Sequence, residues 1–260
     1  MANKILFMGR KPVAAKCLEW LCTNQEIEVV GVITDSHLSV SPTNDIAIKY
    51  KIPVYSREEV ERGVSNGSIY FDLALSMVYW QKVRQPIISQ SSKGVINFHP
   101  APLPDFKGTA GYNMAILNGL DKWAVSAHYI DESFDTGPII DVDYFSISPD
   151  TETARSLESK TQPRLLSLFK NTVLRAINQN ELLPMKENKG GIYISREEME
   201  AMKEIRNGDD IERKIRAFWF PPYDGAYIII NGQKFTLVNN FILQQLADPL
   251  TSNLFSPDAN

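Results

Sequence analysis

Two short segments in the middle of the chain carry residue types that suit acyl chemistry. Asn97 and His99 lie in the first segment, which continues into a proline-rich stretch, and Asp135 lies in the second, within an Asp-Thr-Gly-Pro turn. An asparagine amide can hold a developing oxyanion, a histidine can take or give a proton near neutral pH, and a partly buried aspartate can orient or charge that histidine. Together these groups favour acyl transfer to an amine without a covalent intermediate.

Each segment has the pattern of a strand that ends in a loop. Residues 94–98 form a short apolar run opened by a glycine and followed by prolines, and residues 123–130 alternate enough for a strand before a turn-rich stretch. Side chains two positions apart share a face of a strand, so Asn97 and His99 should point the same way. The prolines remove N–H donors and stiffen the loop, which suits a preorganised site.

The same residues have simpler structural interpretations. A lone histidine at a strand end is usually a satisfied polar residue, and Asp-Thr-Gly-Pro by itself is an ordinary turn. The chain has three histidines, however, and His99 and His128 both belong to these segments, whereas His37 lies in a polar stretch. No metal is expected, because the histidines and the two cysteines, Cys17 and Cys22, lack metal-ligand spacing.

The joint pattern resembles the paired motifs of the 10-formyl-tetrahydrofolate-dependent formyltransferases. The residues that carry it are Asn97-x-His99-Pro100-x-x-Leu103-Pro104-x-Phe106-Lys107-Gly108 and His128-x-Ile130-Asp131-x-x-x-Asp135-Thr136-Gly137-x-Ile139. The similarity spans residues 4–140, 215–218 and 222–226. It implies that Asn97, His99 and Asp135 are catalytic, and that 10-formyl-tetrahydrofolate is the co-substrate.

Strand and helix patterns alternate along the first half of the chain. Strands are predicted at residues 5–8, 27–33, 73–77, 94–98 and 123–130, and helices at 12–20, 45–51, 81–89 and 112–118. This order predicts an α/β fold with a Rossmann-like, doubly wound and mostly parallel sheet. Ligands of such folds bind outside the carboxyl ends of the strands, so Asn97, His99 and the turn after Ile130 should meet at one edge of the sheet.

The second part of the chain predicts a long helix and then a small C-terminal α+β unit. An amphipathic helix is expected over residues 153–176, followed by a polar link over 178–191. We assign residues 1–185 to the catalytic domain and 186–260 to the smaller unit. Its expected elements are a charged, solvated helix at 196–205, a helix at 211–220, and a hairpin of 226–230 and 234–238 around Asn231-Gly232. The resemblance implies that this unit pairs two copies into a homodimer, and residues from 248 are expected to be loose.

The composition agrees with an ordinary globular enzyme. Of the 260 residues, 43% are hydrophobic and 22% are charged, which is enough to bury a sizeable core. The sequence has neither a signal-peptide pattern nor an apolar run of membrane-spanning length. We therefore expect a cytoplasmic protein with no membrane partner, in the compartment where the folate donor would be found.

The charge balance bears on the amine that receives the formyl group. A tRNA acceptor favours a basic surface, yet 27 basic and 31 acidic residues give a formal charge of −4, so no nucleic-acid partner is expected. The loop after Asp35 lacks the long basic insertion of the tRNA formyltransferases, and few residues follow Gly225 for their C-terminal barrel. Glycinamide ribonucleotide formyltransferases lack a counterpart of residues 186–260. The remaining resemblance is to the nucleotide-sugar N-formyltransferases, which act on dTDP-linked 3-amino or 4-amino deoxysugars for lipopolysaccharide O-antigen.

Candidate binding residues flank the catalytic three. By the resemblance, two stretches face the pterin, namely Met77, Val78, Tyr79 and Trp80, and Tyr129, Ile130 and Asp131. The acceptor candidates are Arg10, Lys11, Phe106, Lys107, Thr109, Trp219 and Tyr223. Arg10 and Lys11 precede a predicted helix and could meet a diphosphate, with a solvated charged loop as the alternative. The aromatic residues could stack on a base or sugar, with a core position as the alternative for Trp219.

The resulting hypothesis is direct attack by a sugar amine on the formyl carbon. Asn97 and a protonated His99 would stabilise the oxyanion, and Asp135 would support proton transfer. Three alternatives stay open: formyl transfer to glycinamide ribonucleotide or methionyl-tRNA, hydrolysis of 10-formyl-tetrahydrofolate, and a non-catalytic nucleotide-binding module.

Overall fold

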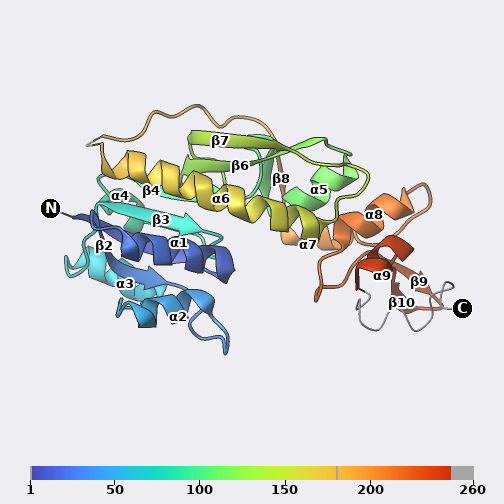
Figure 1. Ribbon diagram of the computed structural model, residues 1–260, viewed down its shortest axis with the longest axis horizontal. Coiled ribbons are helices and arrows are strands. Elements are labelled where there is room, and N and C mark those ends of the chain that lie inside the picture. The colour runs from blue at the N-terminus through green and yellow to red at the C-terminus, as the bar shows by residue number, and fades with distance from the viewer. Residues whose placement is uncertain (1, 180, 247–260) are drawn as a thin grey trace, which may run out of the picture.

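A six-stranded sheet forms the centre of the molecule, with helices on both faces (Figure 1). The computed structural model describes residues 2–179 and 181–246. In spatial order the strands are β2 (Ile27–Ile33), β1 (Asn3–Gly9), β3 (Leu73–Met77), β4 (Val95–His99), β6 (Lys122–Tyr129) and β7 (Ile139–Ser146). β1 pairs in parallel with β2 and β3, and β3 pairs in parallel with β4, whereas β6 is antiparallel to β4 and β7. The predicted α/β fold with a mostly parallel sheet is confirmed.

Alternating side chains of β1 point to opposite faces of the sheet, and different helices cover each face. The helices of this part of the chain are α1 (Lys11–Thr23), α2 (Pro42–Lys49), α3 (Arg57–Ser65), α4 (Ile87–Gln90), α5 (Gly111–Leu117) and α6 (Ala154–Ile177). Ile5 and Phe7 join an apolar cluster with α1 and α6, and Leu6 and Met8 join a second one with α3 and α4. Apolar side chains on both sides of a strand are typical of a sheet that is buried on both faces. Figure 1 shows α6 crossing the length of the sheet beside α1.

The longest helix, α6, has a capping box at its N-terminus, and the side chain of a distant lysine binds its C-terminal carbonyl oxygens. Thr153 Oγ1 accepts a hydrogen bond from the Ser156 N–H, and Ser156 Oγ accepts one from the Thr153 N–H. At the other end, Lys93 Nζ donates to the carbonyl oxygens of Ala176 and Ile177 at 3.1 and 3.0 Å. A cation at a helix C-terminus also interacts favourably with the helix dipole. Neither α6 nor any other helix in the described part of the chain is long and apolar enough to cross a membrane.

The remaining elements are short. They are β5 (Phe106–Gly108), β8 (Ile192–Ile194), α7 (Arg196–Ala201), α8 (Ile211–Phe218), β9 (Tyr227–Ile230), β10 (Gln233–Thr236) and α9 (Asn240–Leu246). β5 pairs in parallel with β8, and β9 and β10 form the predicted hairpin. Figure 1 shows α8, α9 and the hairpin gathered at one end of the molecule. Their apolar cluster includes Ile116 from α5 and Ala154 from α6. The division at residue 186 stays a prediction, and the expected loose tail from residue 248 lies outside the described residues.

Three expected helices are shorter in the structure, and the one expected at 211–220 ends at Phe218. The helix expected at 81–89 spans only Ile87–Gln90, because Pro86 has no N–H and does not fit a helix interior. The helix expected at 196–205 ends at Ala201, and the Ile205 N–H donates instead to the carbonyl oxygen of Tyr227 in the hairpin. Tertiary pairing thus ends α7 early. The prediction also lacked α3 and β7.

The direction of β6 changes how the site is assembled. In the register of the two antiparallel strands, Asn97 lies beside His128 and His99 lies beside Ser126. The carboxyl end of β6 therefore lies next to the amino end of β4, and the prediction that both strand ends meet at one edge is wrong. The loop between β6 and β7 folds back and brings Asp135 to His99 and Asn97.

Candidate active site

Asn97 projects from β4 and makes hydrogen bonds through both of its polar atoms. Its Oδ1 accepts from Ser76 Oγ at 2.8 Å, and Ser76 is its neighbour in the register of β3 and β4. Its Nδ2 lies 3.0 Å from His128 Nε2 and 3.4 Å from Asp135 Oδ1. A distance of 3.4 Å is long for a hydrogen bond, so one amide hydrogen is weakly engaged. This N–H can donate a hydrogen bond to a developing oxyanion.

His99 ends β4 and is buried with both ring nitrogens facing oxygens. Nε2 lies 3.0 Å from the carbonyl oxygen of Phe106, and Nδ1 lies 3.5 Å from Asp135 Oδ2. In the neutral ring, Nε2 therefore carries the hydrogen and Nδ1 keeps its lone pair. Burial lowers the pKa of His99 below its ordinary value of 6.5, and the Asp135 carboxylate offsets part of that effect. His99 is thus a neutral base at neutral pH, whereas the sequence-based hypothesis began from a protonated ring.

Asp135 lies between two histidines. Its Oδ2 accepts the backbone N–H of Gly108 at 3.0 Å, and its two oxygens lie 3.5 Å from His99 Nδ1 and His128 Nε2. Burial opposes ionisation of this carboxyl, but the two histidines and the Gly108 N–H outweigh burial and hold its pKa well below its usual range. Asp135 is therefore a carboxylate at every working pH. Gly108 has a φ of 81°, and a Cβ there would lie 2.4 Å from the carbonyl oxygen of Ile194, so a side chain would displace this N–H.

His128 belongs to the site although it is not among the residues predicted to be catalytic. It is buried on β6, and its Nδ1 donates to the carbonyl oxygen of Tyr129 at 2.8 Å. Nε2 is then left to accept from Asn97 Nδ2, which orients the Asn97 amide. The signal that could have found it is the register of β4 and β6, which the spacing of the motifs does not reveal. Ser76 had a weaker signal, as the hydroxyl in an otherwise apolar strand.

The catalytic candidates line a cavity of about 710 Å³, which we call the site cavity. This volume lies within the range of small-molecule sites. The predicted site residues that line it are Arg10, Lys11, Val78, Tyr79, Trp80, Asn97, His99, Thr109, Ile130, Asp131, Asp135 and Tyr223. Lining residues that the sequence did not indicate include Lys82, Glu158, Tyr193, Arg196 and Lys203. The cavity thus joins the strand ends of the sheet to residues of the C-terminal region.

The other five predicted binding residues do not line the site cavity. Met77 and Tyr129 are buried in the main apolar cluster. Phe106 packs against Trp123, with ring centroids 5.4 Å apart, and contributes its carbonyl oxygen to His99. Lys107 Nζ donates to the carbonyl oxygen of Gly190 at 2.8 Å. Trp219 packs against the C-terminal apolar cluster, which matches its alternative as a core residue.

The N-terminus of α1 carries two cations at the site cavity. Arg10 is the N-cap residue but makes no side-chain cap, and the first turn of α1 has no acidic residue. The guanidinium lies 5.4 Å from the centroid of the Trp80 ring, and its buried Nε has no hydrogen-bond partner among the described residues. Lys11 Nζ lies 3.6 Å from Glu158 Oε1. Uncapped N–H groups, the helix dipole and a guanidinium together favour an anionic ligand.

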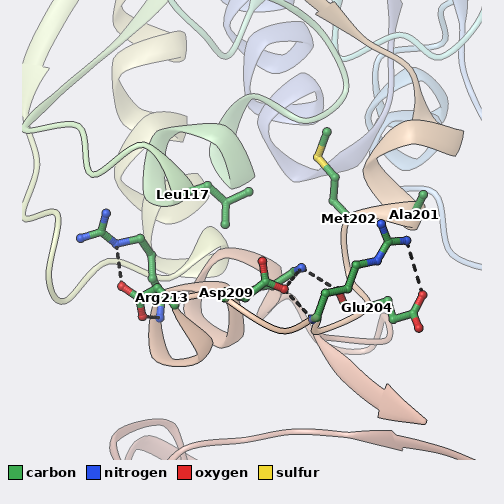
Figure 2. Close-up of a pocket in the computed structure, with 10 residues that line it drawn as sticks. Leu117, Ala201, Met202, Glu204, Asp209 and Arg213 are labelled. Atoms are coloured by element: carbon green, nitrogen blue, oxygen red, sulfur yellow. Dashed lines mark hydrogen bonds and ion pairs between the residues drawn. The ribbon is translucent and has the colours of Figure 1, made fainter.

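A second cavity, of about 550 Å³, lies against the C-terminal region (Figure 2). Its charged side chains pair with one another. Lys214 Nζ donates to Asp209 Oδ2 and to the carbonyl oxygen of Glu204, both at 2.6 Å, and Arg213 Nε lies 3.5 Å from Asp210 Oδ2. The site cavity differs because it contains Asn97, His99 and Asp135, and we take it as the candidate active site.

Three side chains of the candidate active site have the chemistry that acyl transfer requires. The Asn97 amide can donate to an oxyanion. The neutral His99 can accept a proton at Nδ1, and the Asp135 carboxylate beside it would stabilise the resulting imidazolium. This arrangement differs from the triads of hydrolases, because the carboxylate faces the ring nitrogen that takes the proton rather than the opposite one, and the serine or cysteine nucleophile of such enzymes is not part of the constellation described here.

Residues 3–170 match the family model described as formyl transferase. Among curated relatives, the methionyl-tRNA formyltransferase of Clostridioides difficile is 31% identical over 151 residues, which cover 53% of this chain and 48% of that protein. The enzyme of the same name from Rickettsia massiliae is 26% identical over 240 residues, which cover 88% of this chain and 77% of that protein. The chain thus spans about half the length of the Clostridioides difficile relative.

Solved structures of sugar N-formyltransferases are also similar to this chain. The Helicobacter canadensis N-formyltransferase, in complex with folinic acid and dTDP-3-aminofucose, is 25% identical, with a TM-score of 0.72 over 90% of this chain and 86% of that chain. A 4-N formyltransferase from Francisella tularensis is 19% identical, with a TM-score of 0.76 over 91% of this chain and 97% of that chain. The second likeness is one of fold alone.

Proposed function

Because this chain belongs to the formyl transferase family, we propose that it moves a formyl group from 10-formyl-tetrahydrofolate to the amine of a nucleotide-linked amino deoxysugar. The observation that carries the proposal is the convergence of Asn97, His99 and Asp135 in one cavity with the cationic N-terminus of α1. The first three residues fit formyl transfer, and the helix N-terminus fits the diphosphate of a nucleotide sugar.

The folate side of the site cavity is proposed to be the wall formed by Val78, Tyr79, Trp80 and Ile130. Apolar and aromatic side chains suit a flat heterocycle. Lys82, at the same wall, lies with its Nζ 5.9 Å from the ring centroid of Phe134 and offers a cation to the carboxylates of a folate tail. Folinic acid in the Helicobacter canadensis structure supports a folate as the partner of this chain.

The chemistry follows from the geometry of the three catalytic candidates. As the amine attacks the formyl carbon, the new C–N bond forms and negative charge collects on the formyl oxygen, within the proposed reach of the Asn97 amide. His99 accepts the proton that the amine loses, and Asp135 stabilises the imidazolium. Collapse breaks the bond to the folate nitrogen, which receives that proton from His99. The residues end in their starting states.

The acceptor side is proposed to include Arg10, Lys11 and aromatic residues of the C-terminal region. Phe220 and Tyr223 line the cavity with ring centroids 6.0 Å apart, and Lys11 Nζ lies 6.0 Å from the Phe220 ring centroid. These rings could stack on a base or a sugar. The lining also carries carboxylates, among them Glu158, Glu200 and Asp224, which can accept hydrogen bonds from the hydroxyl and amino groups of a sugar.

Methionyl-tRNA is the second candidate acceptor, because the curated relatives that cover most of this chain are named methionyl-tRNA formyltransferases. Mass spectrometry decides between the two. The protein is incubated with 10-formyl-tetrahydrofolate and, separately, with dTDP-linked 3-amino and 4-amino deoxysugars, their UDP counterparts, glycinamide ribonucleotide and charged methionyl-tRNA. We expect a formyl adduct on a nucleotide sugar; an adduct on the tRNA or the ribonucleotide alone would overturn the choice of acceptor. Cytoplasmic location and a role in O-antigen synthesis stay predictions.

Replacing Arg10 tests the proposed diphosphate contact. We expect Arg10→Ala to raise the KM of the sugar acceptor by roughly 10-fold to 100-fold, because a charge-assisted hydrogen bond is lost. The KM of the folate donor should not change. Steady-state kinetics with each substrate varied in turn measures the effect, and Lys16→Ala, on the exposed face of α1, is the control. An unchanged acceptor KM would remove Arg10 from the acceptor site.

The hairpin is proposed to pair two copies of the chain. Ile230 and Phe235 are about half exposed and lie on the same face of it, and apolar side chains clustered on a surface are typical of interfaces. Light scattering should give twice the mass of the 29.4 kDa chain, and Ile230→Asp with Phe235→Asp should give the monomer. Ile48→Asp, at an exposed position of α2, should leave the dimer intact. A wild-type monomer would contradict this proposal.

A further inference from the structure

Residues 183–194, which we call the strap, lie along the rim of the candidate active site. The strap follows α6 and lies outside the residues that match the family model. Its first contact is the Leu183 N–H, which donates to the Tyr129 hydroxyl at 2.7 Å. Lys186 then exchanges two backbone hydrogen bonds with Ile139, at 2.7 and 2.8 Å. The last part is β8, which pairs with β5. The strap is thereby attached to the strand ends on both sides of the Asp135 loop and, through β5, to the loop after β4.

Asn188, in the middle of the strap, reaches the loop of Asp135. It is nine-tenths buried, and its Nδ2 donates to the carbonyl oxygens of Asp135 and Gly137, at 3.0 and 2.8 Å. Its Oδ1 has no hydrogen-bond partner among the described residues. The hydrogen bonds of this side chain within the described residues therefore come from its NH₂ group alone, which joins two carbonyl oxygens of the Asp135 loop.

The backbone of Asp135 needs such support. Its φ is 55°, in the left-handed region that residues other than glycine seldom adopt. The two carbonyl oxygens bound by Asn188 belong to Asp135 itself and to the residue two positions later, so one amide closes the turn at the strained residue. The strap also supports the other side of the carboxylate, because Gly108, whose N–H binds Asp135 Oδ2, lies in β5 and pairs with β8.

We infer that Asn188 is a positioning residue that holds the Asp135 carboxylate against His99. This inference rests on the proposed function for its catalytic consequence, but the contact itself can be tested without turnover. The groups that face Asp135 are His99 from β4, His128 from β6, the Asn97 amide and the Gly108 N–H. Without Asn188 the turn relaxes, the 3.5 Å approach of Asp135 to His99 is lost, and the imidazolium formed in the reaction loses its counter-charge.

The close approach of the strap to the rim of the site requires a glycine. Gly191 has a φ of 74°, and a Cβ there would lie 1.7 Å from the carbonyl oxygen of Pro104. The following N–H, of Ile192, donates to the carbonyl oxygen of Asp105 at 2.9 Å. The strap is thus seated on the backbone of the loop after β4, and Asn188 is fixed from both sides.

Two variants separate the hydrogen bonds of Asn188 from the shape of its side chain. Asn188→Leu keeps the four branched heavy atoms of the side chain without a donor, and Asn188→Ala removes both. We expect kcat to fall by up to about 100-fold in both variants, as for a catalytic group displaced by about 1 Å, with the KM of both substrates unchanged. Lys189→Ala, which removes only an exposed ion pair with Glu187, should keep the wild-type kcat. Urea unfolding shows whether each variant is folded.

Histidine NMR gives a readout that does not depend on activity. The chain has three histidines, so labelled rings give three sets of signals, and His99→Gln identifies the set of His99. We expect the His99 midpoint to move to lower pH in both Asn188 variants, because the nearby carboxylate that favours the imidazolium has moved away. Wild-type kcat and an unchanged His99 midpoint in Asn188→Leu would overturn the inference. If the wild-type protein transfers no formyl group, the proposed function fails, and the His99 midpoint alone decides the role of Asn188.

Discussion

Asn97→Ala should lower kcat by roughly 100-fold to 1,000-fold, the usual effect of removing one oxyanion donor. We attribute this loss of kcat to the oxyanion contact, because the hydrogen bonds of the side chain to Ser76 and His128 serve to orient it. The KM of both substrates should change little, because the amide acts on charge that develops only in the transition state. Steady-state formation of the formylated product measures the effect.

The control for this substitution is the same change elsewhere. Asn178, at the end of α6, donates through Nδ2 to the carbonyl oxygen of Leu174 on the surface, so Asn178→Ala should keep the wild-type kcat. Urea unfolding of both variants shows that loss of activity is not loss of the fold. If folded Asn97→Ala turns over at the wild-type rate, Asn97 does not hold the oxyanion.

Asp135→Asn should lower kcat by roughly 100-fold to 10,000-fold, the range of general acid–base contributions. The substitution keeps the shape of the side chain but removes the charge that stabilises the His99 imidazolium. It should also change the pH profile. His99 must be neutral to accept a proton, so activity is present above its pKa and is lost as the pH falls through that value. Burial places the pKa below 6.5, and loss of the Asp135 charge places it lower still.

The acid limb of kcat/KM should therefore move to lower pH in Asp135→Asn. The profile is measured between pH 5 and 8 for both proteins, at enzyme concentrations that compensate for the slower variant. Asp141→Asn is the matched control, because that carboxylate pairs with Arg175 on the surface and does not line the site cavity. A limb that moves to higher pH, or that is equal in both proteins, would contradict the role of Asp135.

The catalytic three could be predicted from the sequence because their types and spacing are local. Asn97 and His99 are two residues apart on one strand, and Asp135 lies in a turn with readable chemistry. The alternation of strands and helices predicted the parallel part of the sheet in the same way. A capping box at Ser56 and Glu59 also marks the start of α3, so that helix could have been predicted as well.

The residues that position the catalytic three could not be predicted, because their places depend on strand direction and on segments distant in the sequence. Spacing does not reveal that β6 is antiparallel to β4, and this direction places His128 beside Asn97. Asn188 lies in a polar stretch that predicts only a link, yet two hydrogen bonds join it to the Asp135 loop. The pairing of β5 with β8 is similar, since such short strands have little pattern of their own.

The fate of a labelled formyl group tests the central claim most directly. The protein is incubated with 10-[¹³C]formyl-tetrahydrofolate and the dTDP-linked amino sugars, and the carbon is followed by ¹³C NMR. Transfer predicts that the label leaves the folate and appears as the formamide of a nucleotide sugar, at a rate that Asn97→Ala strongly reduces. Label that appears as free formate at the same rate with and without an amino sugar, or that stays on the folate, would contradict formyl transfer by this site.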